Sequence, residues 1–157
     1  MAGVDRGRGG GPGAASAAIA DVVGWQQVRS WNINHVLDAA RAKLRRLTPQ
    51  EAAGRAHEGW TLVDTRSIDA LTRDGRIPGA VHAPLGVLEW RVDPASGYQD
   101  PAIAGMVERL ILVCAEGYSS SLAAVRLQEL GFTETTDVIG GFEAWTAAGL
   151  PVELPSA

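Results

Sequence analysis

The sequence predicts an α/β domain built on a mostly parallel central sheet. From about residue 48 onward, short apolar runs alternate with segments of helical character, which is the pattern of strands connected by helices. A hydrophobic content of 46% over 157 residues is sufficient for one domain of ordinary size. The only cysteine, Cys114, follows one of the apolar runs, at the end of a strand where α/β sheets bind ligands.

Two segments precede this domain. Residues 1–32 are predicted to be a disordered or loosely docked leader, because they begin with a Gly- and Ala-rich stretch that has no large side chain for a core. Trp25 and Trp31 are expected to dock the leader onto the body or to join a subunit contact. Residues 33–47 are predicted to form an amphipathic helix with basic residues outside its apolar face. A membrane-surface helix is the alternative, but the apolar face is narrow and lacks aromatic residues.

The elements of the domain follow from their start and stop residues. Pro49 in a first turn, with Glu51 close behind it, marks the beginning of a helix. Gly131 and Gly149 are expected to end the last two helices. The expected order is a helix from residue 48, a strand at 60–64, a short helix from 67, a strand at 80–82, a helix at 101–109, a strand at 110–114, a helix from 119 or 120, a strand at 136–139 and a helix at 142–148.

Cys114 lies where a buried strand should lead into a helix. Gly117 allows the intervening loop a positive φ, and Ser119 to Ser121 offer a cap for the helix. Backbone N–H groups and the positive end of a helix would then face the thiol and favour the nucleophilic thiolate. The alternative is an inert buried thiol. We favour the reactive cysteine and expect its pKa to lie below that of a free cysteine.

Composition excludes several classes of function. A single cysteine rules out an internal disulfide, a Cys-x-x-Cys redox pair and a zinc knuckle, and His35, His57 and His82 lack metal-ligand spacing. We expect neither a metal nor a cofactor. Acidic residues outnumber basic ones in residues 48–157, which argues against a nucleic-acid partner. The apolar runs are too short for a membrane span, and no signal peptide is recognisable, so we expect a cytoplasmic protein.

Four landmarks occur in an order that resembles the single-domain rhodaneses, a sulfurtransferase family. They are the segment 62–66, the segment 75–82 with its Gly-Arg-Ile-Pro-Gly-Ala-Val-His sequence, the strand, loop and helix around Cys114, and the segment 140–151. The resemblance covers about residues 46–153. It implies a rhodanese-like three-layer domain, with helices flanking the central sheet.

The resemblance also implies a chemistry. Cys114 would take a sulfane sulfur from thiosulfate or a persulfide donor, carry it as a persulfide, and pass it to a thiol or cyanide acceptor. A sulfur-accepting protein is a further candidate partner. By the same match, the substrate-binding cradle would consist of the backbone N–H groups of Ala115, Glu116, Gly117, Tyr118, Ser119 and Ser120.

One residue of the cradle departs from the family pattern, in which the loop runs Cys-x-x-Gly-x-Arg-Ser/Thr. Ser119 occupies the arginine position, so the loop loses a planar, charged donor suited to a sulfonate. Arg66 or Arg76 is expected to support the site from a neighbouring loop. Asp64 and Arg66 are nevertheless expected to act mainly as an ion pair beneath the site, because a carboxylate near a thiolate raises the thiol pKa. Glu116 is expected to face solvent.

Two other functions fit the same residues. A non-catalytic rhodanese-like interaction or regulatory module would explain the missing arginine, although the cysteine and the loop glycine are present. A cysteine-dependent phosphatase or arsenate reductase shares the strand, loop and helix geometry. Phosphoryl chemistry generally requires an arginine in the loop, and residues 115–121 contain none.

Overall fold

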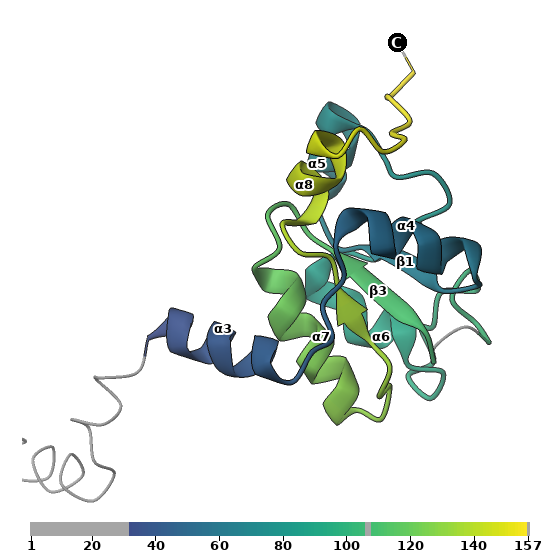
Figure 1. The fold of residues 1–157 in the computed structure, drawn as a ribbon. Coiled ribbons are helices and arrows are strands. Elements are labelled where there is room, and N and C mark those ends of the chain that lie inside the picture. Colours follow the sequence, from purple (N-terminus) through teal and green to yellow (C-terminus); the bar gives the residue numbers. More distant parts are fainter. Residues whose placement is uncertain (1–31, 106–107, 157) are drawn as a thin grey trace, which may run out of the picture. The chain divides into compact units, whose positions relative to one another are not determined.

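A computed structural model describes residues 32–105 and 108–156 (Figure 1). The chain divides into two units, residues 1–36 and 37–157. Helix α3 (Ile33–Ala42) spans the boundary between the two units. It ends at Ala42, whereas the predicted helix extended to residue 47. Asn32 caps its start, because its Oδ1 accepts the backbone N–H groups of Asn34 and His35 at 3.0 and 3.3 Å. The predictions made for residues 1–31, including those for Trp25 and Trp31, lie outside the described residues.

The second unit contains a four-stranded sheet of order β2-β1-β3-β4, in which all neighbouring strands are parallel. The predicted α/β class is therefore confirmed. Because the strands are parallel, their carboxyl ends lie at one edge of the sheet, and Cys114 follows the end of β3 there. The strands are β1 (Thr61–Asp64), β2 (Val81–His82), β3 (Leu110–Val113) and β4 (Thr136–Asp137).

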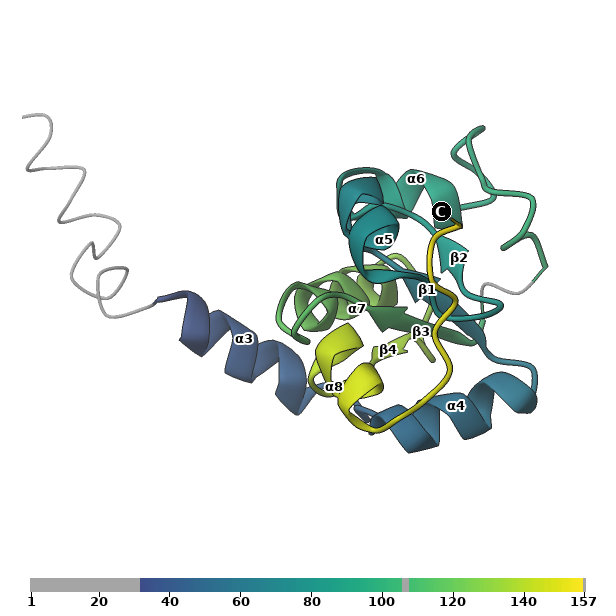
Figure 2. The same cartoon turned by 90° about the horizontal axis from the view of Figure 1, so that it is seen from above.

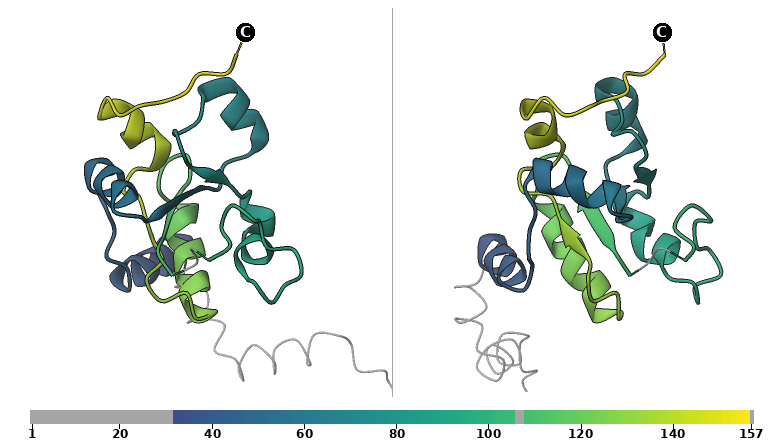
Figure 3. Two further views of the ribbon diagram at one scale, coloured as in Figure 1. Left: turned by 90° about the vertical axis from the view of Figure 1, so that its right-hand side faces the viewer. Right: turned by 45° about the vertical axis from the view of Figure 1, so that its right-hand side comes forward.

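Helices cover both faces of this sheet (Figure 2, Figure 3). Every residue of β1 and β3 is buried, which explains why the four residues of β3 are all apolar. Alternate strand residues enter two separate cores. Leu110 and Leu112 pack with residues of α6 and α7, whereas Ile111 and Val113 pack with residues of α4 and α8. The helices are α4 (Pro49–His57), α5 (Ile68–Asp74), α6 (Leu88–Val92), α7 (Ser119–Glu129) and α8 (Gly141–Ala147), with a 3₁₀ turn η1 (Leu85–Val87) before α6.

The segment before α4 runs beside β4. The backbone N–H of Leu47 donates to Asp137 O at 3.0 Å, and Ile139 N–H donates to Leu47 O at 2.8 Å. The Thr136 hydroxyl donates to Arg45 O at 2.9 Å. Helix α4 then starts with a complete capping box formed by Thr48 and Glu51. These hydrogen bonds hold residues 45–47 against β4, the outermost strand on one side of the sheet.

One predicted helix is wrong. Residues 101–105 form turns rather than the first part of a helix at 101–109. The Asp100 carboxylate accepts the N–H of Ala102 at 2.9 Å, and Gly105 has φ +80°, so side-chain bonding and a left-handed residue shape this segment. The helix of this region is α6, which the sequence did not reveal. Among the described residues, no helix combines the length and apolar character that crossing a bilayer requires.

Candidate active site at Cys114

The loop after Cys114 is held by close backbone contacts. Gly117 has φ +81°, and a Cβ atom there would lie 2.6 Å from Gly140 N. A Cβ atom on Gly141 would collide with Cys114 O. The first N–H groups of α8 bind the loop carbonyls, because Phe142 N–H donates to Cys114 O at 2.8 Å and Glu143 N–H to Ala115 O at 3.0 Å. These bonds turn the two carbonyls toward α8.

Hydrogen bonds surround the sulfur of Cys114, which is buried with 6% of its surface exposed. The N–H of Gly117 donates to Sγ at 3.1 Å, and Sγ lies 3.2 Å from Ser120 Oγ. Burial by itself raises the pKa of the Cys114 thiol. Hydrogen bonds from the hydroxyl and the backbone N–H of Ser120, from the Ser119 hydroxyl and from the Gly117 N–H lower that pKa, and together they bring it below its ordinary value.

A buried carboxylate lies one side chain away from this thiol. Asp137, at the end of β4, is fully buried. Its Oδ2 accepts the hydroxyls of Ser120 and Ser121, each at 2.8 Å. Arg46 binds both carboxylate oxygens, with Nε 2.9 Å from Oδ1 and Nη2 3.2 Å from Oδ2. Asp137 is thus fully partnered, and it connects the segment before α4 to the first turn of α7.

The hydroxyl protons determine the direction of this network. A hydroxyl has one proton, so Ser120 donates to Asp137 and accepts the S–H of neutral Cys114. When the thiolate forms, Ser120 must turn that proton to the sulfur to stabilise it. Arg46 and Ser121 then still satisfy Asp137. The predicted role of the serines as caps is wrong, because Tyr118 occupies the cap position of α7 and makes no side-chain cap bond.

Two arginines bind the outer side of the loop. Arg41 Nη2 and Arg46 Nη2 both donate to Gly117 O, at 2.7 and 3.0 Å. Arg41 Nε also donates to Ser121 Oγ at 3.3 Å, and its guanidinium lies 5.3 Å from the ring centre of the exposed Tyr118. Sequence reasoning did not assign Arg41, Arg46 or Asp137 to the site. An aspartate within a short buried strand was the one available signal.

The arginines expected to support the site make other contacts. Arg66 forms a buried ion pair with Asp64 at 2.7 Å, donates to Gly75 O at 2.9 Å, and stacks 3.6 Å from the ring centre of Phe142. Arg76 is exposed and pairs through its backbone with Glu153. None of these contacts involves residues 115–120. Within those residues, Glu116 and Ala115 are exposed, and Ser119 is half-buried.

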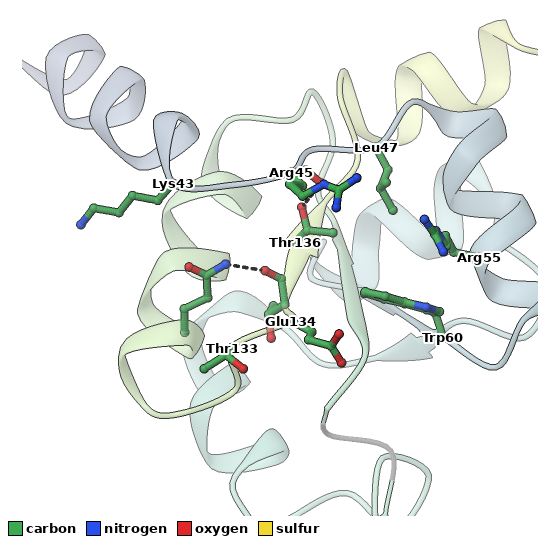
Figure 4. Close-up of a pocket in the computed structure, with 10 residues that line it drawn as sticks. Lys43, Arg45, Leu47, Arg55, Trp60, Thr133, Glu134 and Thr136 are labelled. Carbon is green, nitrogen blue, oxygen red and sulfur yellow. Dashed lines mark hydrogen bonds between the residues drawn. The ribbon is translucent and has the colours of Figure 1, made fainter.

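A cavity of about 460 Å³ lies elsewhere in the same unit (Figure 4). Trp60, which precedes β1, and Glu134, which precedes β4, place it at the amino ends of the strands, whereas Cys114 follows the carboxyl end of β3. Figure 4 shows Lys43 and Arg45 beside this cavity, together with Trp60 and Glu134. The cavity therefore does not belong to the Cys114 site.

Comparison with known proteins agrees with this arrangement. The family model described as "Rhodanese-like domain" matches residues 48–148. Thiosulfate sulfurtransferase GlpE of Pseudomonas savastanoi pv. phaseolicola is 35% identical over 106 residues, which cover 67% of this chain and 90% of that protein.

Two solved structures extend the likeness to the fold. The polysulfide-sulfur transferase homodimer of Wolinella succinogenes is 28% identical with a TM-score of 0.62, and the match covers 78% of this chain and 87% of that one. A Rhodopseudomonas palustris protein of unknown function, described as a possible tyrosine phosphatase, is 33% identical with a TM-score of 0.71 and coverages of 78% and 95%. With its parallel sheet, its cysteine loop and the match over residues 48–148, the chain belongs to the rhodanese family.

Proposed function

We propose that this protein is a sulfurtransferase in which Cys114 carries a sulfane sulfur as a persulfide. The proposal depends on one property of the Cys114 thiol, its lowered pKa. Its pKa is lowered by hydrogen bonds from the loop and the first turn of α7, and Gly117 N–H points at Sγ from 3.1 Å. Relatives named thiosulfate sulfurtransferase and polysulfide-sulfur transferase support the same chemistry.

The proposed reaction has two displacements at sulfur. The Cys114 thiolate attacks the outer sulfur of thiosulfate, a new S–S bond forms, and the original S–S bond breaks as sulfite leaves with the electron pair. A thiolate or cyanide acceptor then attacks the outer sulfur of the persulfide, and Cys114 leaves as a thiolate. No net oxidant is needed. The loop N–H groups stabilise the anionic sulfur in both steps.

The donor is either thiosulfate or a persulfide, and the acceptor is a thiol, cyanide or a sulfur-accepting protein. A chain whose lone thiol must stay reduced between turnovers suits the cytoplasm, which is where we place it. We assign the sulfur-binding role to the backbone N–H groups of residues 115–120, with Cys114 as the nucleophile.

Mass spectrometry of the intact protein tests the proposal. After incubation with thiosulfate, glutathione persulfide or inorganic polysulfide, the wild-type chain should gain the mass of one sulfur, and cyanide should remove it. The Cys114→Ser variant should gain none. If the wild-type thiol reacts with iodoacetamide yet gains no sulfur from any donor, the protein is a non-catalytic member of the family.

A phosphate-ester assay tests the second candidate, a cysteine-dependent phosphatase, which the description of the Rhodopseudomonas palustris protein suggests. Residues 115–121 contain no arginine to hold phosphate oxygens, so we expect no turnover of p-nitrophenyl phosphate above that of Cys114→Ser. Turnover faster than sulfur transfer would reverse the assignment.

A further inference from the structure

We propose that Arg41 and Arg46, which precede the family-matched region, position and polarise the cysteine loop in place of the arginine that the loop lacks. This inference rests on the proposed sulfur transfer and adds two positioning residues to it. Both guanidinium groups converge on a single atom, Gly117 O, from outside the loop. Ser119 contributes no charge at the position where the family pattern has arginine.

The two arginines determine the orientation of the peptide group between Gly117 and Tyr118. In a planar trans peptide the C=O and the next N–H point in opposite directions. Because Arg41 and Arg46 hold Gly117 O on their side, the Tyr118 N–H is directed away from them. This N–H has no acceptor among the described residues, so it is available to an anion in the loop. Two cationic donors on the carbonyl also polarise the peptide and strengthen that N–H as a donor.

Arg46 and Arg41 also change the charge around the sulfur, each in a different way. The carboxylate of Asp137 is separated from Cys114 Sγ by only the Ser120 hydroxyl, and an unpaired carboxylate there would oppose thiolate formation. Arg46 neutralises it with two hydrogen bonds. Arg41, by contrast, forms no ion pair with any described residue, and its side-chain partners are Gly117 O and Ser121 Oγ. Its positive charge therefore acts on the loop without a carboxylate bound to it. The loop has one acid of its own, Glu116, and that side chain is exposed.

The backbone places both arginines beside the loop. Leu37 and Ala40 are buried, which fixes the last turn of α3, where Arg41 lies. The bonds between Leu47 and β4 fix Arg46 next to Asp137. Lys43 and Arg45 lie beside the cavity of Figure 4 instead, so the same short segment provides matched basic residues that do not bind the loop.

The test uses full-length Arg41→Gln and Arg46→Gln, with Arg45→Gln as the control. Iodoacetamide alkylation as a function of pH measures the pKa of Cys114, and persulfide formation from thiosulfate measures KM and kcat. Arg41→Gln should raise the thiol pKa and increase the KM for thiosulfate roughly tenfold, an effect of the size of one charged hydrogen bond. Arg41→Lys should recover part of both effects, because it restores the charge but not the planar fork.

Arg46→Gln leaves Asp137 buried without its cation, so circular dichroism must show that this variant is folded. The double variant Arg46→Gln/Asp137→Asn removes both charges. If charge neutralisation is the role of Arg46, the single variant raises the thiol pKa and the double variant returns it toward the wild-type value.

The proposal is overturned if Arg41→Gln leaves both the thiol pKa and the KM equal to those of Arg45→Gln. Alkylation does not require sulfur transfer. The positioning role of the arginines and the sulfurtransferase activity can therefore be rejected independently of each other. A shifted thiol pKa without any persulfide formation would keep the positioning role and reject the proposed function.

Discussion

Two buried ion pairs occur at the carboxyl edge of the sheet, and they have different neighbours. Asp64 ends β1 and binds Arg66 at 2.7 Å, whereas Asp137 ends β4 and binds Arg46 at 2.9 Å. Arg66 also binds Gly75 O and stacks on Phe142, so the first pair ties loops and core together. Asp137 instead accepts the hydroxyl that contacts Cys114.

Two ion pairs of the same chemical identity therefore have different roles, because their neighbours differ. Both pairs join arginine to aspartate with little exposure, and both would leave a buried charge if one partner were removed. Only the second is connected to the sulfur by hydrogen bonds. We therefore expect the first pair to control stability and the second to control the thiol, and the following substitutions separate the two effects.

The largest expected loss of stability follows Arg66→Met. The substitution leaves the Asp64 carboxylate buried without its cation, which should lower the free energy of unfolding by about 3–5 kcal/mol. Urea denaturation followed by circular dichroism measures this loss. The pH dependence of Cys114 alkylation in the folded variant should match that of wild type, and a changed thiol pKa would show that the two pairs are not separate.

Gly117→Ala should have the next largest effect, because it disturbs the loop while keeping both ion pairs. The new Cβ would meet Gly140 N, and φ +81° is strained for alanine, so we expect a loss of about 3 kcal/mol. The Gly117 N–H should move from Sγ, which raises the thiol pKa. Gly54→Ala is a suitable control, since a Cβ built there meets no atom within 4 Å apart from its chain neighbours and the backbone of its own helix. Equal alkylation profiles for the two variants would mean that loop geometry does not control the thiol.

Asp137→Asn should cost less stability, about 2 kcal/mol, because an amide oxygen can still accept one hydroxyl while Arg46 loses its charged partner. Its main effect should be on chemistry. Removing a negative charge near the sulfur favours the thiolate, so the pKa of Cys114 should fall. Asp64→Asn is the matched control and should leave that pKa unchanged. A rise after Asp137→Asn would contradict the electrostatic role.

The last prediction changes only the pH and substitutes no residue, so it leaves the stability of both ion pairs out of the measurement. Since the thiolate is the nucleophile and hydrogen bonds lower the pKa of Cys114, sulfur loading should increase with pH to a plateau whose midpoint lies below ~8.5, the value for a free cysteine. Below the midpoint the rate should fall about tenfold per pH unit, because the thiolate fraction does so. Loading measured between pH 5 and 10 with a stable donor tests this, and a midpoint above ~8.5 would mean that burial dominates.

The sequence predicted what is local. The strand, loop and helix around Cys114 are consecutive in the chain, and Asp64 and Arg66 are separated by one residue, so their neighbourhood could be inferred. The pair of Arg46 with Asp137 depends on the register between Leu47 and β4, which no local pattern specifies. Tertiary contacts also overrode a local preference, because Ser120 and Ser121 direct their hydroxyls to Asp137 instead of capping a helix.

The backbone bonds of Leu47 have a further consequence for solubility. β4 is the last strand of the sheet, and an open strand edge invites pairing with another chain. Leu47 occupies part of that edge by bonding to Asp137 O and Ile139 N–H. A chain trimmed to residue 48, where the family match begins, would expose these groups together with the unpaired Asp137 carboxylate. Such trimming should therefore promote aggregation, a risk that the intact segment suppresses.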